Sequence, residues 1–100
     1  MWYAIFGRDR PGSLEKRKRW QKRHLARLKA LQEEGRLLLA GPLPAIDSPD
    51  PGPAGFQGSL IVAEFPSLQE AEAWMAEDPY VREGVYASFQ IFPFLKRLPE

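Results

Sequence analysis

The sequence contains no cysteine, and this absence excludes disulfide bonds, thiolate metal sites and cysteine nucleophiles. Asparagine and threonine are also missing, and histidine occurs once, as His24. A lone histidine without cysteines argues against a zinc site, and we expect no metal and no cofactor. No run of about 18 apolar residues is present, so we expect no membrane span. The apolar start at 1–6 lacks a basic lead and a cleavage site, and a cytoplasmic location is therefore the expectation.

The length and the charge pattern predict one globular domain with segregated charges. One hundred residues, 44% hydrophobic and 27% charged, are typical of a single domain over 1–100. Ten of the 14 basic residues lie between Arg8 and Lys29, and six acidic residues lie between Glu64 and Glu83. The basic segment raises nucleic-acid binding as an alternative function. The near-zero net charge and the absence of a nucleic-acid motif argue against that partner.

Hydrophobic periodicity predicts four strands and two main helices. Ser13 precedes the first helix as a candidate N-cap, and Ser67 opens a capping box before the second helix. Asp78, followed by Pro79, is expected to cap a short additional helical turn. The expected strands are 2–7, 36–43, 59–65 and 85–94, and the expected helices cover 14–34 and a segment that starts near 67.

The first predicted helix has an apolar stripe that turns polar at one end. Leu25, Leu28 and Leu31 recur at helical spacing, and His24 falls near the middle of the same stripe. Arg17 lies in this sector as well, towards the start of the helix. A stripe of this kind either runs past the edge of the core or lines a cleft there.

The order of the predicted elements is βαββαβ, which indicates an α+β, ferredoxin-like fold. In this fold two main helices cover one face of an antiparallel four-stranded sheet. Several strands, including 2–7 and 59–65, are apolar on both faces, and the run 37–40 resembles a strand buried on both faces. The second sheet face therefore needs a partner, and we predict a homodimer packed sheet to sheet.

A long connection at 44–58 separates the second and third strands. It contains four prolines and two carboxylates, Asp47 and Asp50. Loops of this length are often functional. Two carboxylates on one loop are a weak signal for a bound cation.

Three segments resemble the YciI-like family. These segments are HLARLKALQEEGRLLLAGPLP, DPGPAGFQGSLIVAEF and AEAWMAEDPYVREGVY. The resemblance covers essentially the whole chain and implies a dimeric α+β barrel built of ferredoxin-like subunits. Some proteins of that barrel, such as muconolactone isomerases, act on small ring compounds, and one YciI-like domain is similar to an enzyme that removes chloride from a chlorinated hydroxyquinol. The resemblance also implies a His–Asp pair, which corresponds here to His24 and Asp78.

A His–Asp pair has a simple chemical use. A carboxylate that accepts one ring N–H fixes the imidazole tautomer and leaves the other nitrogen as a base. We therefore predict acid–base chemistry by His24 and Asp78 on a small cyclic or phenolic metabolite, of lyase, isomerase or dehydrochlorinase type. Alternatively, His24 is a hydrogen-bonded interior histidine and Asp78 only a helix cap. The protein would then be a non-catalytic small-molecule-binding or structural homodimer.

Four further residues are candidates for substrate binding. Ser59 begins the third predicted strand, and Gly41 and Pro42 end the second, so these residues could line one cleft. Tyr80 follows the Asp–Pro pair and could offer a hydroxyl group. As alternatives, the first three are turn and packing residues and Tyr80 is a partly buried aromatic side chain.

Overall fold

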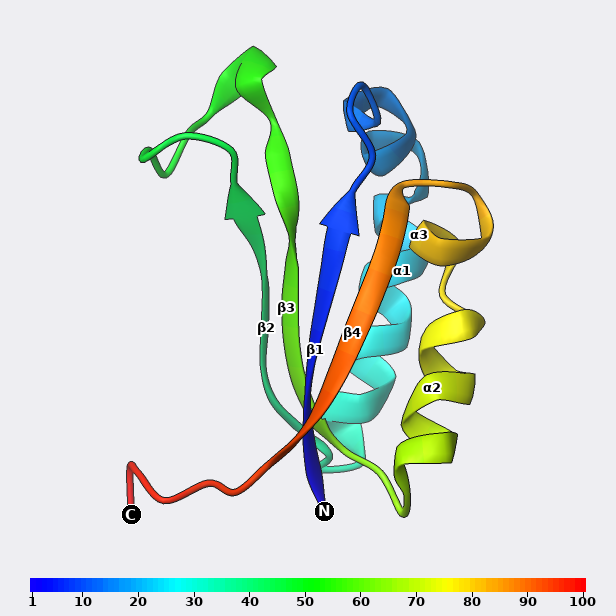
Figure 1. Ribbon diagram of the computed structural model, residues 1–100, viewed down its shortest axis with the longest axis vertical. Coiled ribbons are helices and arrows are strands. Elements are labelled where there is room, and N and C mark those ends of the chain that lie inside the picture. Colours follow the sequence, from blue (N-terminus) through cyan, green and yellow to red (C-terminus); the bar gives the residue numbers. More distant parts are fainter.

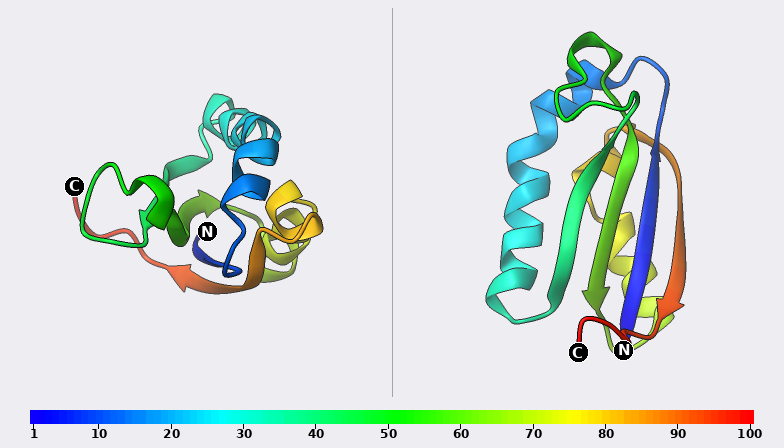
Figure 2. Two further views of the ribbon diagram at one scale, coloured as in Figure 1. Left: turned by 90° about the horizontal axis from the view of Figure 1, so that it is seen from above. Right: turned by 90° about the vertical axis from the view of Figure 1, so that its left-hand side faces the viewer.

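The computed structural model describes residues 1–100 as an antiparallel four-stranded sheet with its helices on one face (Figures 1 and 2). The strand order is β2-β3-β1-β4, so the fold is the predicted α+β, ferredoxin-like arrangement. The elements are β1 (Trp2–Asp9), α1 (Leu14–Glu33), β2 (Leu37–Pro44), a 3₁₀ turn η1 (Gly52–Ala54), β3 (Phe56–Glu64), α2 (Leu68–Ala76), α3 (Pro79–Arg82) and β4 (Tyr86–Phe94).

The core lies between the sheet and the two longer helices. Ile5 of the central strand β1 pairs with Ile61 of β3 and with Ile91 of β4, and Ile5 and Ile61 are fully buried. Leu28 and Leu31 of α1 pack into the same cluster, as predicted. Leu25 is 41% exposed, so its predicted place in the core is wrong. It lines a cavity beside α1 instead.

The opposite face of the sheet is open in the single chain (Figure 2). Phe6 and Phe92 contact each other edge to face on this surface, with ring centroids 6.3 Å apart, and are 41% and 48% exposed. The prediction that the second strand is buried on both faces is wrong for the single chain. β2 is an edge strand, and its Leu39 is 47% exposed.

Two of the three predicted helix caps are present. The Ser67 side chain accepts a hydrogen bond from the Glu70 N–H, and Asp78 accepts one from the Tyr80 N–H. Ser13 occupies the position before α1, but its side chain makes no capping bond. Its backbone (φ −93°, ψ 6°) is not extended, as a side-chain cap requires, so the prediction of a Ser13 cap is wrong.

An irregularity in β4 changes which side chains face the helices. The register shifts between Arg8 and Asp9, whose partners are Ser88 and Tyr86, so Ala87 has no partner. Strict alternation along β4 from Ile91 would put Tyr86 on the other face, but the shift turns it into the core. Its ring fills the space above Gly7, where an added Cβ would lie 2.6 Å from the Tyr86 Cζ. The Tyr86 ring fits there because Gly7 has no side chain.

The long connection is shorter than expected because β3 begins at Phe56. The remaining loop, 45–55, folds towards the start of α1 (Figure 2). Gly55 lies next to the Leu14 side chain, and the Ala45 N–H donates to the Gly55 carbonyl across 2.9 Å. The loop thereby closes one end of the space between α1 and the sheet. None of the helices combines the length and the apolar character needed to cross a bilayer.

Candidate active site

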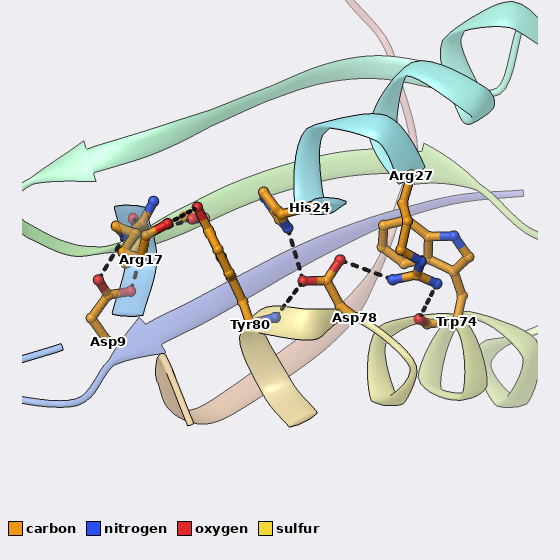
Figure 3. A network of polar contacts seen from close by, with 9 residues as sticks. Asp9, Arg17, His24, Arg27, Trp74, Asp78 and Tyr80 are labelled. Carbon is orange, nitrogen blue, oxygen red and sulfur yellow. Dashed lines mark hydrogen bonds and ion pairs between the residues drawn. The ribbon is translucent and has the colours of Figure 1, made fainter. Parts of the chain in front are cut away.

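The structure brings His24 and Asp78 into direct contact. His24 projects from the middle of α1, and Asp78 precedes α3 (Figure 3). The His24 Nδ1 lies 2.8 Å from the Asp78 Oδ2. Both side chains are buried, with 5% of His24 and none of Asp78 exposed. The two residues are 54 positions apart in the chain, so only the fold places them together.

The other contacts of Asp78 indicate which hydrogen lies between the pair. The Arg27 guanidinium donates to Oδ1 across 2.8 Å, and the Tyr80 N–H donates to Oδ2 across 3.0 Å. Both oxygens of the Asp78 side chain therefore accept hydrogen bonds from groups that can only donate. We therefore assign the His24 hydrogen to Nδ1, where it is donated to Asp78. In this tautomer Nε2 carries the free lone pair.

The free Nε2 of His24 has access to a cavity. Nε2 has no hydrogen-bond partner in the chain. Only one side-chain polar atom both lacks a partner and is sealed from solvent, and that atom is the Tyr86 hydroxyl oxygen. Nε2 is therefore not sealed. His24 lines a cavity of about 260 Å³ between α1, β2 and β3. Its lining residues are Arg17, Gln21, His24, Leu25, Leu28, Lys29, Gln32, Leu37, Ala40, Gly41, Pro42, Ser59, Ile61 and Tyr80.

The predicted substrate-binding residues meet at this cavity. Gly41 and Pro42 of β2 lie on its wall, and Pro42 is the register partner of Ser59 on β3. Ser59 is buried, with 3% exposed. Asp78 does not line the cavity and contacts it only through His24. The arrangement places the His24 imidazole at the surface of the cavity and the Asp78 carboxylate behind it.

Tyr80 supports His24 rather than offering a free hydroxyl. Its ring stacks on the imidazole, with centroids 4.0 Å apart and an interplanar angle of 10°. Its hydroxyl donates to the Arg17 carbonyl across 3.0 Å. Burial raises the pKa of the Tyr80 phenol, so the phenol keeps the hydrogen that it donates. Tyr80 thus fixes the plane of the His24 ring.

Arg17 is part of the site although it was not predicted as a site residue. Its guanidinium donates to both Asp9 carboxylate oxygens (2.8 and 3.1 Å), to the Gly58 carbonyl (2.9 Å) and to the Ser59 Oγ (2.8 Å). Burial alone would lower the pKa of this guanidinium, but the hydrogen bond and charge of Asp9 raise it. Arg17 and His24 are seven residues apart, which places them on one helix face, and this spacing was the available signal.

Arg27 was also not predicted. It holds Asp78 from the side opposite His24, and its Nη2 donates to the Trp74 carbonyl across 2.7 Å. Its guanidinium lies 4.2 Å above the centroid of the Trp74 ring. These contacts hold the Arg27 guanidinium in place beside the Asp78 carboxylate.

The charges around the cavity are of one sign. Arg17 and Lys29 are among its lining residues, whereas no aspartate or glutamate is. Asp9 pairs with Arg17 and Asp78 pairs with Arg27, and neither carboxylate lines the cavity. A ligand with an ionised or strongly polarised oxygen therefore suits the cavity better than a cation.

Other parts of the surface lack a comparable arrangement. A larger hollow of about 710 Å³ lies near Met1, Arg36 and Trp74, and neither His24 nor Asp78 lines it. Asp47 and Asp50 lie in the loop between β2 and β3. Nowhere in the chain do three or more His, Cys, Asp or Glu side chains converge as they would around a metal ion.

Comparison with known proteins places this geometry in a family. The YCII-related domain model matches residues 1–95. The chain is 55% identical over 96 residues to Protein YciI of Escherichia coli O6:H1, covering 96% of this chain and 98% of that protein. An uncharacterized protein of Haemophilus influenzae shows the same identity over the same shares of the two chains.

A solved structure has a similar fold. It is 5-chloro-2-hydroxyhydroquinone dehydrochlorinase (TftG) from Burkholderia phenoliruptrix AC1100 in a complex with 2,5-dihydroxybenzoquinone. The TM-score is 0.82, with 29% sequence identity, and the match covers 95% of this chain and 94% of that one. This neighbour has the dimeric α+β barrel class of fold that the family resemblance implied. From the family model and these relatives, the chain belongs to the YCII-related, or YciI-like, family.

Proposed function

We propose that this protein is an enzyme that carries out acid–base chemistry on a small cyclic or phenolic metabolite. One observation carries the proposal: the buried His24–Asp78 pair leaves Nε2 as a free acceptor at a cavity of about 260 Å³. His24 acts as the general base, and Asp78 orients the imidazole and stabilises the imidazolium that forms. The cavity is slightly smaller than the sites of drug-sized ligands, about 300 Å³ or more, and suits a single substituted ring.

The proposed step is a proton transfer from a ring hydroxyl to the Nε2 of His24. The O–H electron pair stays on the substrate and forms a carbonyl as the ring electrons shift. In an isomerase, His24 returns the proton to a ring carbon. In a dehydrochlorinase, chloride leaves with the C–Cl electron pair from the carbon that has received a proton, and the next deprotonation yields the quinone. The carbon that exchanges chlorine for hydrogen is reduced while the two carbons that become carbonyls are oxidised, so no external oxidant is consumed.

The structural neighbour supports this substrate class. Its name gives a chlorinated hydroxyhydroquinone as substrate, and its complex holds a dihydroxybenzoquinone. At 29% identity over nearly the whole chain, we extend the class of substrate to this protein, and not the individual compound. The apolar side chains of Leu28 and Ile61 in the cavity wall suit a flat ring of this kind.

A screen with product analysis tests the proposal. The protein is incubated with 5-chloro-2-hydroxyhydroquinone, other halogenated hydroquinones and small unsaturated lactones, and products and released halide are measured. We expect turnover of at least one ring compound without an added cofactor. Saturable binding throughout the panel without any product would favour the non-catalytic alternative and contradict the enzyme proposal.

We also propose that two copies pair through the open sheet face. The exposed apolar side chains of this face lie on three strands, and they are Phe6, Leu39, Phe92 and Phe94. Several exposed apolar side chains on one sheet face are unusual on a monomer, and a second copy offers a complementary face.

Phe6→Glu tests the pairing. In a two-fold interface the change buries two unpaired carboxylates, and each is penalised by several kcal/mol. We expect the dimer to dissociate at least ~100-fold more readily in sedimentation equilibrium. Leu68→Glu is the matched control, because Leu68 is similarly exposed (39%) but lies on α2. A monomeric wild-type protein at micromolar concentration, or equal effects of both changes, would exclude this interface.

A further inference from the structure

Of the lysine and arginine side chains that line the cavity, only Lys29 has no partner in the chain. The other cation in the wall, Arg17, is held by two bonds to Asp9 and by two further acceptors on β3. Lys29 is exposed and forms no ion pair, although Glu33 follows it one helical turn later. Its ammonium group is therefore free to bind a ligand in the cavity.

The free cation and the paired cation lie on opposite sides of His24 along α1, which runs beside the edge strand β2 (Figure 2). Lys29 is five positions after His24, which is about 7.5 Å along the helix axis. Arg17 is seven positions before it, or about 10 Å in the other direction. A ligand that contacts His24 and extends towards the C-terminal end of α1 therefore meets an uncompensated positive charge.

An apolar surface lies between His24 and Lys29. Leu25 and Leu28 both line the cavity, and so does Leu37 of β2. Leu25 is 41% exposed although it has the helical spacing of a core residue. A ring that rests on this surface would cover Leu25, and burial of the apolar area would stabilise the complex. The wall thus offers a base, an apolar platform and a free cation in succession.

A single ammonium group suits a carboxylate better than a phosphate. One ammonium balances the one charge of a carboxylate, whereas a phosphate ester carries nearly two charges at neutral pH and usually binds several cations or the N–H groups at a helix start. Lys29 lies in the C-terminal half of α1, away from the helix start. The side-chain amides of Gln21 and Gln32 also line the cavity, and each can donate to a carboxylate oxygen.

We infer that Lys29 binds a carboxylate of the ligand while the ring of the ligand covers Leu25 and Leu28 beside His24. The ligand class is then a monocyclic hydroxy acid, with its ring hydroxyl at the His24 Nε2 and its carboxylate at the opposite end of the ring. This inference rests on the proposed function and narrows its substrate class. Lys29 determines which substituent the ring carries, and it takes no part in the proton transfer.

The compounds 4-hydroxybenzoate and 4-hydroxybenzamide test this inference by calorimetric binding at neutral pH. They share the ring and the hydroxyl, and they differ only in whether the opposite group is a carboxylate or a neutral amide. We expect the wild-type protein to bind the carboxylate about fivefold more tightly, the upper range for an ion pair that stays partly in water. Lys29→Met should remove this preference by weakening the carboxylate alone, because methionine keeps an apolar stem without the charge. Lys29→Arg should retain the preference.

Lys16→Met is the matched control. It removes the same charge from α1, but the Lys16 Nζ lies near Gly84 and Lys16 does not line the cavity, so the preference should stay intact. The inference is overturned if the wild type shows no preference, if both methionine variants reduce the preference equally, or if neither compound binds. A preference that depends on Lys29, without turnover of any compound, would reject the proposed enzyme and leave this subsite standing. Turnover without the preference would do the reverse.

Discussion

Replacing His24 by glutamine is expected to lower kcat by roughly 10²- to 10⁴-fold on any ring compound that the protein turns over. The amide can still donate to Asp78 but offers no basic nitrogen to the cavity. Initial rates of the wild-type and variant proteins with the same ring compound measure the effect.

The His24 variant should remain folded, because Asp78 keeps its contacts with Arg27 and with the Tyr80 N–H. Gln21→Ala is the matched control. Gln21 lines the same cavity one helical turn away and makes no hydrogen bond in the chain, so its loss should change the rate little. If folded His24→Gln retained the wild-type rate, proton transfer by this imidazole would be ruled out.

The fold could be predicted from local features of the sequence. The βαββαβ order emerges from alternating and helical apolar patterns, and Ser67 and Asp78 mark two helix starts by their spacing to the residues that they cap. Pro93 lies in β4, and β4 is an edge strand, where proline within a sheet is normally found. These features depend on a few neighbouring residues, so they can be recognised without knowing where the rest of the chain lies.

The wrong predictions share a physical cause, which is dependence on tertiary contacts. Leu25 has the spacing of a core residue, but α1 borders a cavity at that point. A one-residue bulge at Ala87 also turns Tyr86 into the core, and no local pattern marks that bulge. Ser13 is of a residue type that often caps helices, but its backbone is not extended as a side-chain cap requires. Periodicity alone cannot place a bulge or a cavity.

The site was predictable in part. The residue types of His24 and Asp78 came from the family resemblance, and the helix periodicity placed His24 on the inner stripe. Their 2.8 Å contact joins α1 to the start of α3 and could not be read from spacing. The helical spacing placed Arg17 in the same sector as His24 but did not indicate a role for it. Its burial depends on Asp9 from β1 and on Gly58 from β3.

The same contacts link stability to function. One series of ion pairs, hydrogen bonds and ring contacts runs across the helix layer and the sheet (Figure 3). Its members are Asp9, Arg17, Tyr80, His24, Asp78 and Arg27. Tyr80 connects the two halves by its stacked ring and its hydroxyl. A change at one end is therefore expected to alter the orientation of His24 as well as the local packing.

Asp78→Ala is expected to have the largest effect on stability, about 3–5 kcal/mol of the free energy of unfolding. The change removes the acceptor of a partly buried Arg27 cation, the partner of His24 Nδ1 and the cap of α3. Asp78 is fully buried, so water cannot readily replace it. Urea unfolding monitored by tryptophan fluorescence measures the loss.

Asp78→Asn separates the charge from the cap. The amide oxygen can still accept from Tyr80 N–H and His24 Nδ1, while its NH₂ group faces Arg27, which is 25% exposed and can turn to solvent. We expect this variant to lose less stability than the alanine variant but to lose most of the activity, because imidazolium is no longer stabilised by a negative charge. Asp47→Ala, on an exposed loop, should stay within about 0.5 kcal/mol of wild type. An alanine variant at position 78 as stable as the Asp47 variant would show that this carboxylate does not hold the site together.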